Sequence, residues 1–126
     1  MAKLLGIDVG TSGAKAILID ETGRILKIAS VEYPLLTPKP GWTEQEPEAW
    51  WTGVQKCLAE IGEKPDAFGL TGQMHGATFL DAQDEVIRPA LLWNDQRTVE
   101  EVARIDEILG PARVRDVTLN PPLTGF

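Results

Sequence analysis

One acidic side chain, Asp8, lies within an apolar run that ends in a turn of glycine, threonine and serine. A second apolar run follows the turn, so the stretch LLGIDVGTSGAKAILID predicts a β-hairpin. Aspartate is depleted in strand interiors, so Asp8 needs a chemical explanation. A carboxylate at the mouth of a turn can hold a metal ion or its bound water, and the turn's N–H groups and the hydroxyls of Thr11 and Ser12 can face phosphate oxygens. The alternative is an ordinary hairpin with an edge aspartate.

The turn differs from the common phosphate-binding loop G-x-x-x-x-G-K-[ST], because that spacing is absent and the turn leads into a strand rather than a helix. It resembles the first phosphate loop of the actin, heat-shock chaperone and sugar-kinase superfamily, in which a D-x-G-T turn joins two strands.

A second polar cluster is the sequence TGQMHG, residues 71–76. Its two flanking glycines permit unusual backbone angles and close approach of a ligand. Gln73 can donate and accept hydrogen bonds, and neutral His75 can do the same through its two ring nitrogens. His75 is the only histidine and has no cysteine near it, which disfavours a metal site. A lone histidine is more often structural than catalytic, and that alternative stays open.

A third cluster begins with Trp93 and continues with Asn94, Asp95, Gln96 and Arg97. Sugars are bound by such sets, in which an aromatic ring covers C–H groups while amides, carboxylates and guanidinium groups hold hydroxyls. The alternative is a polar entry to a helix, with the acid and the arginine paired in solvent. Two such clusters in one small domain could converge on one polyol.

The elements that must position these clusters begin with a three-stranded antiparallel meander over residues 4–9, 14–20 and 25–33. A punctuated loop follows over 35–46, and a further strand is predicted over 66–70. Strands that are followed by helices alternating with short strands predict a mixed α/β sheet with helices packed on it. The pattern is that of a ribonuclease-H-like domain.

Two helices are predicted. The first spans residues 47–61, with proline in its first position, an apolar stripe at helical spacing and Gly62 at its end. The second follows Thr98, which has capping-box spacing to Glu101, and stops at Gly110 and the next proline. The sequence loses its pattern after that proline, and no element is predicted in the tail LNPPLTGF, residues 119–126.

The composition limits the partners of the chain. It has 126 residues, enough for one domain with its own core, and a net charge of -7. This charge argues against nucleic acid or an anionic membrane as a partner. A single cysteine excludes a disulfide framework, which favours the cytoplasm. We expect no membrane-spanning segment and no signal peptide.

Four stretches, DVGTSGAK, PGWTEQEPEAWW, GLTGQMHG and RPALLWNDQRT, resemble in the same order the xylulokinases of the FGGY carbohydrate kinase family. The resemblance covers essentially the whole chain. It implies a fold of two ribonuclease-H-like domains, with ATP and Mg²⁺ as cofactors and transfer of a phosphoryl group to the 5-hydroxyl of D-xylulose. It implies nucleotide- and metal-side roles for Asp8, Gly10, Thr11, Ser12 and Lys15, and sugar-side roles for Gln73, Met74, His75, Trp93, Asn94, Asp95 and Arg97, with Gln96 beside them.

Members of that family are roughly four times longer, as two domains require. We therefore expect residues 1–126 to be a truncated N-terminal domain that lacks the second domain, the adenosine pocket and the general base, an aspartate. Such a chain would have little activity alone and would self-associate or form a homodimer through surface that the rest normally covers. The alternative is a non-catalytic pentose-binding or interaction module with the same fold. An actin- or chaperone-like ATPase is disfavoured, because nothing there needs the two polar clusters.

Overall fold

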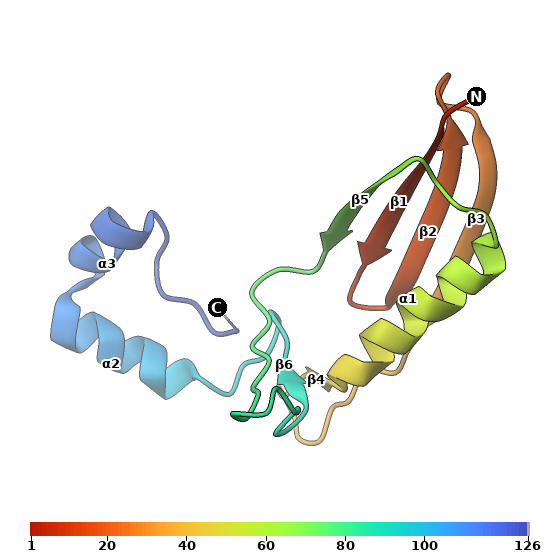
Figure 1. Cartoon of the computed structure of the whole chain (residues 1–126). Helices are drawn as coiled ribbons and strands as arrows, with labels where there is room; N and C mark the ends of the chain where they lie inside the picture. Colours follow the sequence, from red (N-terminus) through yellow and green to blue (C-terminus); the bar gives the residue numbers. More distant parts are fainter. Residues whose placement is uncertain (126) are drawn as a thin grey trace. The chain divides into compact units, whose positions relative to one another are not determined.

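The computed structural model describes residues 1–125, which divide into two compact units (Figure 1). The first unit contains residues 1–35 and 46–73. The second contains residues 36–45 and the described residues from Met74 onward. None of the helices within residues 1–125 has the length and apolar character needed to cross a lipid bilayer.

The first unit is built on a four-stranded sheet of β1 (Lys3–Val9), β2 (Gly13–Asp20), β3 (Ile25–Glu32) and β5 (Ala67–Gly72). The strand order is β3-β2-β1-β5. The first three strands pair antiparallel, whereas β5 pairs parallel to β1. This arrangement confirms the predicted meander and the mixed α/β sheet.

Helix α1 (Pro47–Ile61) packs on one face of this sheet, over β2 and β3 (Figure 1). Its bounds are those predicted from the sequence, and Gly62 ends it in the left-handed conformation, with φ 60°. Because successive side chains in a strand alternate between faces, every second residue of the meander points at the helix. The buried residues at this contact are Leu5, Ile7, Ala14, Ala16, Leu18, Ala29, Tyr33, Cys57 and Ile61.

The same alternation places Asp8 on the face of the sheet opposite to Leu5 and Ile7. Gly6 and Gly69 are register partners on that second face, and a Cβ atom added to either would meet no atom within 4 Å. The sheet therefore carries no side chains at Gly6 and Gly69 next to Asp8, and we call this area the bare floor of the sheet.

Gly13, in contrast, has no space for a side chain, because a Cβ atom there would lie 2.5 Å from the Val31 carbonyl oxygen of β3. We expect Gly13→Ala to lower the free energy of unfolding by about 1–3 kcal/mol, since backbone atoms of β3 must move. Gly69→Ala is the matched control and should be neutral or slightly stabilising. Urea unfolding of both variants measures the difference, and equal stability of the two would contradict the steric argument.

The turn between β2 and β3 is organised by the buried carboxylate of Asp20. Its Oδ1 accepts hydrogen bonds from the Thr22 amide, the Thr22 hydroxyl and the Arg24 amide at 2.9, 2.6 and 3.1 Å. The Thr22 hydroxyl has the largest effect on the pKa of Asp20. Together with the two amides and the Arg24 side chain it outweighs the opposing effect of burial and lowers this pKa from 3.8 to about 2.

This lowered pKa predicts a specific acid sensitivity. The folded state binds the Asp20 proton more weakly than the unfolded state, so the stabilisation is fully present above pH 3.8 and is lost as the pH falls towards about 2. In Asp20→Asn this contribution is absent at every pH. We therefore expect the difference in urea midpoint between the parent chain and Asp20→Asn to shrink between pH 5 and pH 2. A difference that stays constant over this range would show that Asp20 does not titrate as described.

The second unit contains β4 (Glu44–Gln45), β6 (Ala90–Leu91), α2 (Val99–Leu109) and α3 (Pro111–Thr118). Strands β4 and β6 form a short antiparallel pair. The predicted second helix is confirmed as α2. Its N-cap is Thr98, as predicted, but the Thr98 side chain makes no capping hydrogen bond.

Two sequence predictions about this unit are wrong. The stretch 35–46 was predicted to lack regular structure, yet it contains β4, whose two residues are buried and pair with Leu91 and Ala90. No element was predicted between Pro111 and the tail, yet α3 begins directly after Gly110 and ends at Thr118. Proline suits the first position of a helix, so Pro111 begins a new helix as well as preventing α2 from continuing. The tail itself, predicted to contain no element, has no helix or strand over its described residues 119–125.

Candidate functional site

The hairpin between β1 and β2 forms a tight loop beside Asp8. The Gly10 amide donates to the Gly13 carbonyl at 3.0 Å, and the Tyr33 hydroxyl donates to the Gly10 carbonyl. A Cβ atom on Gly10 would lie 3.7 Å from Oδ2 of Asp8, so the turn folds closely over this carboxylate. The carboxylate remains exposed at the carboxyl end of β1.

Both burial and the negative charge of this carboxylate affect the pKa of Tyr33. Burial raises the pKa of the Tyr33 hydroxyl, and the nearby negative charge of Asp8 raises it further. The phenol is therefore held neutral and serves as the donor that anchors the loop at Gly10.

Lys15 is the cross-strand register partner of Asp8, and Thr71 is its partner on β5. These three side chains border a cavity of about 380 Å³ on the sheet face away from α1. The bare floor of the sheet provides the rest of the lining, which consists of Gly6, Ile7, Ile17, Gly69 and Leu70.

The structure places Gln73 with the loop of the first unit. Its amide donates to the Val9 carbonyl at 2.9 Å, and the Thr11 hydroxyl donates to its side-chain oxygen at 3.2 Å. The division between the units falls directly after Gln73. The predicted site residues thus form two groups, one in each unit, and the sequence had grouped Gln73 with Met74 and His75.

Met74 and His75 belong to the second unit, in which a backbone bridge joins their segment to that of Trp93. The amides of Ala77 and Leu91 donate to each other's carbonyls at 2.8 and 3.0 Å. His75 and Trp93 each lie two residues along the chain from this bridge. The structure therefore brings these two predicted sugar-side segments together.

His75 has a φ of 60°, one of the few positive values at a non-glycine residue among residues 1–125. This left-handed conformation costs about 1–2 kcal/mol for most L-residues. Such a backbone aims a side chain in a direction that a regular strand would not reach, and strained conformations of this kind gather at ligand sites.

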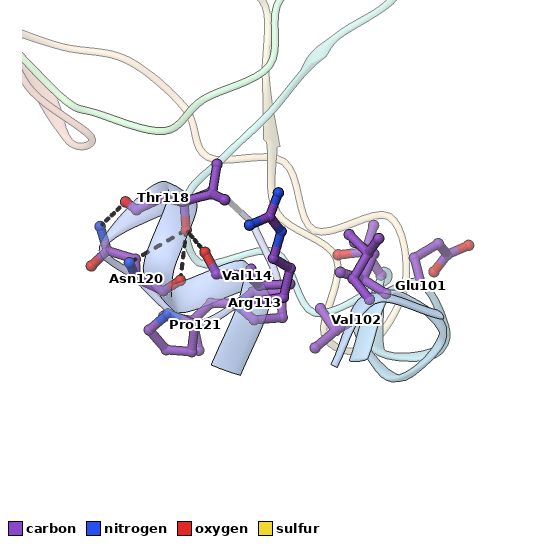
Figure 2. A pocket seen from close by; sticks show the side chains of 13 residues that line it. Glu101, Val102, Arg113, Val114, Thr118, Asn120 and Pro121 are labelled. Carbon is purple, nitrogen blue, oxygen red and sulfur yellow. Dashed lines mark hydrogen bonds between the residues drawn. The ribbon is translucent and has the colours of Figure 1, made fainter. Parts of the chain in front are cut away.

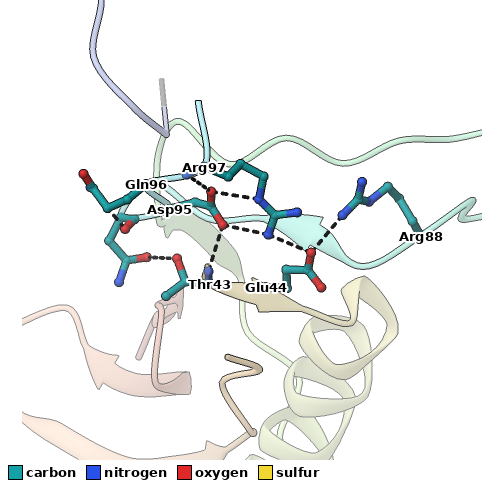
Figure 3. A network of polar contacts seen from close by, with 7 residues as sticks. Thr43, Glu44, Arg88, Asp95, Gln96 and Arg97 are labelled. Carbon is teal, nitrogen blue, oxygen red and sulfur yellow. Dashed lines mark hydrogen bonds and ion pairs between the residues drawn. The ribbon is translucent and has the colours of Figure 1, made fainter. Parts of the chain in front are cut away.

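The segment that contains Trp93 also contains a buried carboxylate, Asp95, which is only 2% exposed (Figure 3). Its Oδ2 accepts from the Thr43 amide at 2.8 Å, and its Oδ1 accepts from the Arg97 amide at 2.9 Å. The Arg97 guanidinium adds a bidentate pair at 2.9 and 2.8 Å. A carboxylate has about four acceptor positions, and these four bonds occupy them.

Arg97 extends this network beyond Asp95. Its Nη2 atom lies 2.7 Å from Oε1 of Glu44, and the same oxygen also accepts from Arg88 at 2.8 Å (Figure 3). The guanidinium carbon lies 3.7 Å from the ring centroid of Trp42, which is a cation–π contact. Neither Glu44 nor Trp42 was predicted to take part in a site, although both lie in the stretch PGWTEQEP.

The charges in this network reinforce one another. Burial by itself would raise the pKa of Asp95, but the hydrogen bonds from Arg97 and from the Thr43 amide outweigh it and lower the pKa. The pKa of Arg97 is raised, chiefly by its hydrogen bond to Asp95 and also by Glu44. Both groups therefore stay ionised at neutral pH.

One cavity of the second unit contains none of the predicted site residues. It has a volume of about 660 Å³ and lies among α2, α3 and the tail (Figure 2). The Thr118 hydroxyl donates to the carbonyls of Val114 and Asn120 at its edge. Its lining is mostly aliphatic, and its charged members are Glu101 and Arg113.

No cluster of three or more potential metal ligands occurs among residues 1–125. Asp8 is thus a single carboxylate beside the tight hairpin loop, which carries backbone amides and hydroxyls. This donor set fits Mg²⁺, which proteins usually hold through one or two carboxylates together with substrate phosphates and water.

Comparison with known proteins places the chain in a family. Residues 3–126 match the FGGY family of carbohydrate kinases, N-terminal domain. The Escherichia coli protein named xylulose kinase is 40% identical over 97% of this chain, which spans 26% of that protein. The chain thus covers about a quarter of the length of such relatives.

Solved structures agree with this assignment. A xylulose kinase structure from Brucella ovis is 42% identical and matches 98% of this chain and 27% of that chain, with a TM-score of 0.87. A gluconate kinase structure from Lactobacillus acidophilus is 25% identical over 91% of this chain and 24% of that chain, with a TM-score of 0.84. These structures share the actin-like, ribonuclease-H-like fold predicted for the chain. This chain belongs to the FGGY family of carbohydrate kinases.

Proposed function

We propose that residues 1–126 form the N-terminal part of an ATP-dependent, cytoplasmic xylulose kinase that converts D-xylulose to D-xylulose 5-phosphate. The sequence similarity to proteins named xylulose kinase supports the substrate class. The gluconate kinase shares the fold, so the choice of sugar must lie in individual side chains. The observation that carries the proposal is the bridge between Ala77 and Leu91, which joins the segment of His75 to that of Trp93.

The proposed sugar-side chemistry depends on the side chains that these two joined segments carry. Trp93 is 45% exposed and Met74 is 71% exposed, so both offer apolar surface to the C–H groups of a pentose. Next to them, the imidazole of His75 and the amide of Asn94 can bind hydroxyl groups. We propose that these four residues make the direct sugar contacts.

The nucleotide side is proposed to be the loop around Asp8. Mg²⁺ bound with ATP would neutralise charge on the phosphates during transfer. Asp8 would hold the ion or its water, while Gly10 shapes the loop through its bond to Gly13 and the amides of Thr11 and Ser12, with the Ser12 hydroxyl, orient phosphate oxygens. Lys15, across the strand pair from Asp8, would add positive charge at the cavity beside it.

A general base that accepts the proton of the 5-hydroxyl is also needed. We propose that it lies outside residues 1–126 and that these residues alone turn over D-xylulose slowly or not at all. We also propose that the isolated chain self-associates, which is supported by the exposed apolar side chains of Phe68 and Leu70 on β5.

The test is expression of the complete open reading frame that contains this sequence, followed by measurement of ATP consumption with D-xylulose, D-ribulose, glycerol and D-gluconate. We expect D-xylulose to give the highest kcat/KM. Saturable binding of a pentose by the complete product without any ATP consumption would favour the pentose-binding module instead.

A further inference from the structure

Given the proposed sugar site, on which this inference rests, we propose that Arg97 is a positioning residue. It fixes the backbone of Trp93 and Asn94 without touching the sugar. The resemblance to sugar kinases implied a sugar-side role for Asp95 and Arg97, but their contacts in the structure are directed into the protein.

The donors of Arg97 are directed at protein groups. Its Nε atom donates to Oδ1 of Asp95, and its Nη2 atom donates to Oδ2 of Asp95 and pairs with Glu44. One face of the guanidinium lies against the ring of Trp42. The side chain is 11% exposed, so little of it can meet a ligand.

These contacts reach Trp93 and Asn94, which we call the sugar-side wall, through Thr43. The Thr43 amide donates to Asp95, and the Thr43 hydroxyl donates to the side-chain oxygen of Asn94 at 2.8 Å. The Leu92 amide in turn donates to the Thr43 carbonyl at 3.1 Å. The segment 92–95 is therefore bonded at Leu92, Asn94 and Asp95 to Thr43, the residue before the Arg97 partner Glu44.

Removing the guanidinium would leave two carboxylates, Asp95 and Glu44, that share Arg97 as a partner. They are 2% and 7% exposed, so water cannot easily solvate their charges. Without Arg97, Asp95 keeps no described cation and Glu44 keeps only Arg88, so the two buried carboxylates repel each other and drive the segments that carry them towards solvent. Trp93 and Asn94 lie directly before Asp95, and we expect them to move with it.

Arg88 provides a matched control. It binds the same Glu44 oxygen at a similar distance, but its side chain is 43% exposed and its described ion pair is with Glu44 alone. Loss of Arg88 removes one positive charge from the network and leaves Asp95 fully bonded. Comparing Arg97→Met with Arg88→Met therefore separates positioning of the wall from loss of charge.

The first experiment needs no activity. In ¹H–¹⁵N spectra of the 126-residue chain, we expect Arg97→Met to shift the Trp93 and Asn94 amide signals and the Trp93 indole signal, while Arg88→Met leaves them in place. Arg97→Lys should shift them as well, because a lysine cannot bridge two carboxylates with a planar fork. If Arg97→Met fails to fold, Arg97→Lys is compared with Arg88→Met in its place. Unmoved signals in a folded Arg97 variant, or equal shifts with Arg88→Met, would overturn the inference.

The second experiment uses the complete open reading frame. A wall that is held out of position should raise KM for D-xylulose by about tenfold or more, with KM for ATP unchanged. Because Glu44 acts through Arg97, the double variant Glu44→Gln/Arg97→Met should raise KM for D-xylulose no more than Arg97→Met does. Independent, multiplying effects of the two changes would instead indicate direct contact with the sugar. If the complete product has no xylulose kinase activity but the spectral shifts occur, the proposed function fails and the positioning role of Arg97 remains.

Discussion

Asp8→Asn in the complete open reading frame should lower kcat for D-xylulose phosphorylation by about 10²–10³-fold, the range seen when one preorganised electrostatic group is removed. The amide keeps the size of the side chain but loses the charge that would hold Mg²⁺ or its water. Because Asp8 is exposed on the sheet face away from α1, the substitution should leave the fold and the thermal midpoint unchanged. A coupled assay of ADP release with varied Mg²⁺ measures the effect.

Asp84→Asn is the control for this variant. It removes the same charge from an exposed turn where φ is 63°, a conformation that asparagine accepts readily. We expect its kcat to equal that of the parent protein. Near-normal turnover by Asp8→Asn would show that the loop is a structural hairpin with an edge aspartate.

His75→Asn should lower kcat/KM for D-xylulose by about a hundredfold, because misplacement or loss of a positioning contact has effects of this size. Asparagine is among the residues that tolerate a positive φ, so the backbone at φ 60° can be retained while the imidazole is lost. We therefore expect the urea midpoint to stay close to that of the parent chain. KM for ATP should also stay the same, since the change lies on the sugar side.

His75→Ala is the companion variant. It loses the same imidazole and places a residue less suited to the left-handed region, so it should lose activity to a similar extent and stability in addition. If both variants lost stability but kept kcat/KM, His75 would be a structural residue, as a lone histidine often is.

Much of the first unit could be predicted from residues that are near each other in the chain. The apolar runs on either side of the Gly-Thr-Ser turn predict the hairpin, and Pro47 with Gly62 defines the bounds of α1. These are local signals, because turn residues and helix ends act over only a few positions. The parallel pairing of β5 with β1 could not be predicted in register, because those strands lie about sixty residues apart.

The second unit was less predictable. Helix α3 was missed because Gly110 and Pro111 were interpreted only as a stop, although proline is equally suited to a helix start. Strand β4 was missed because two residues give no periodicity; it exists through its pairing with β6. The role of Glu44 depends on Arg97, fifty-three positions later, and no local pattern could have connected them.

The sequence by itself determined the kinds of chemistry available, namely one carboxylate at a phosphate-type turn and two clusters of sugar-binding side chains, because residue types and turn spacing are local properties. Only the tertiary structure decided how these groups are used. It joined the segment of His75 to that of Trp93 through a bridge at Ala77, and it turned Asp95 and Arg97 inward to Glu44 and Trp42. The physical reason is that a buried charge must find its partner wherever the folded chain supplies one, and that location is set by packing between distant segments.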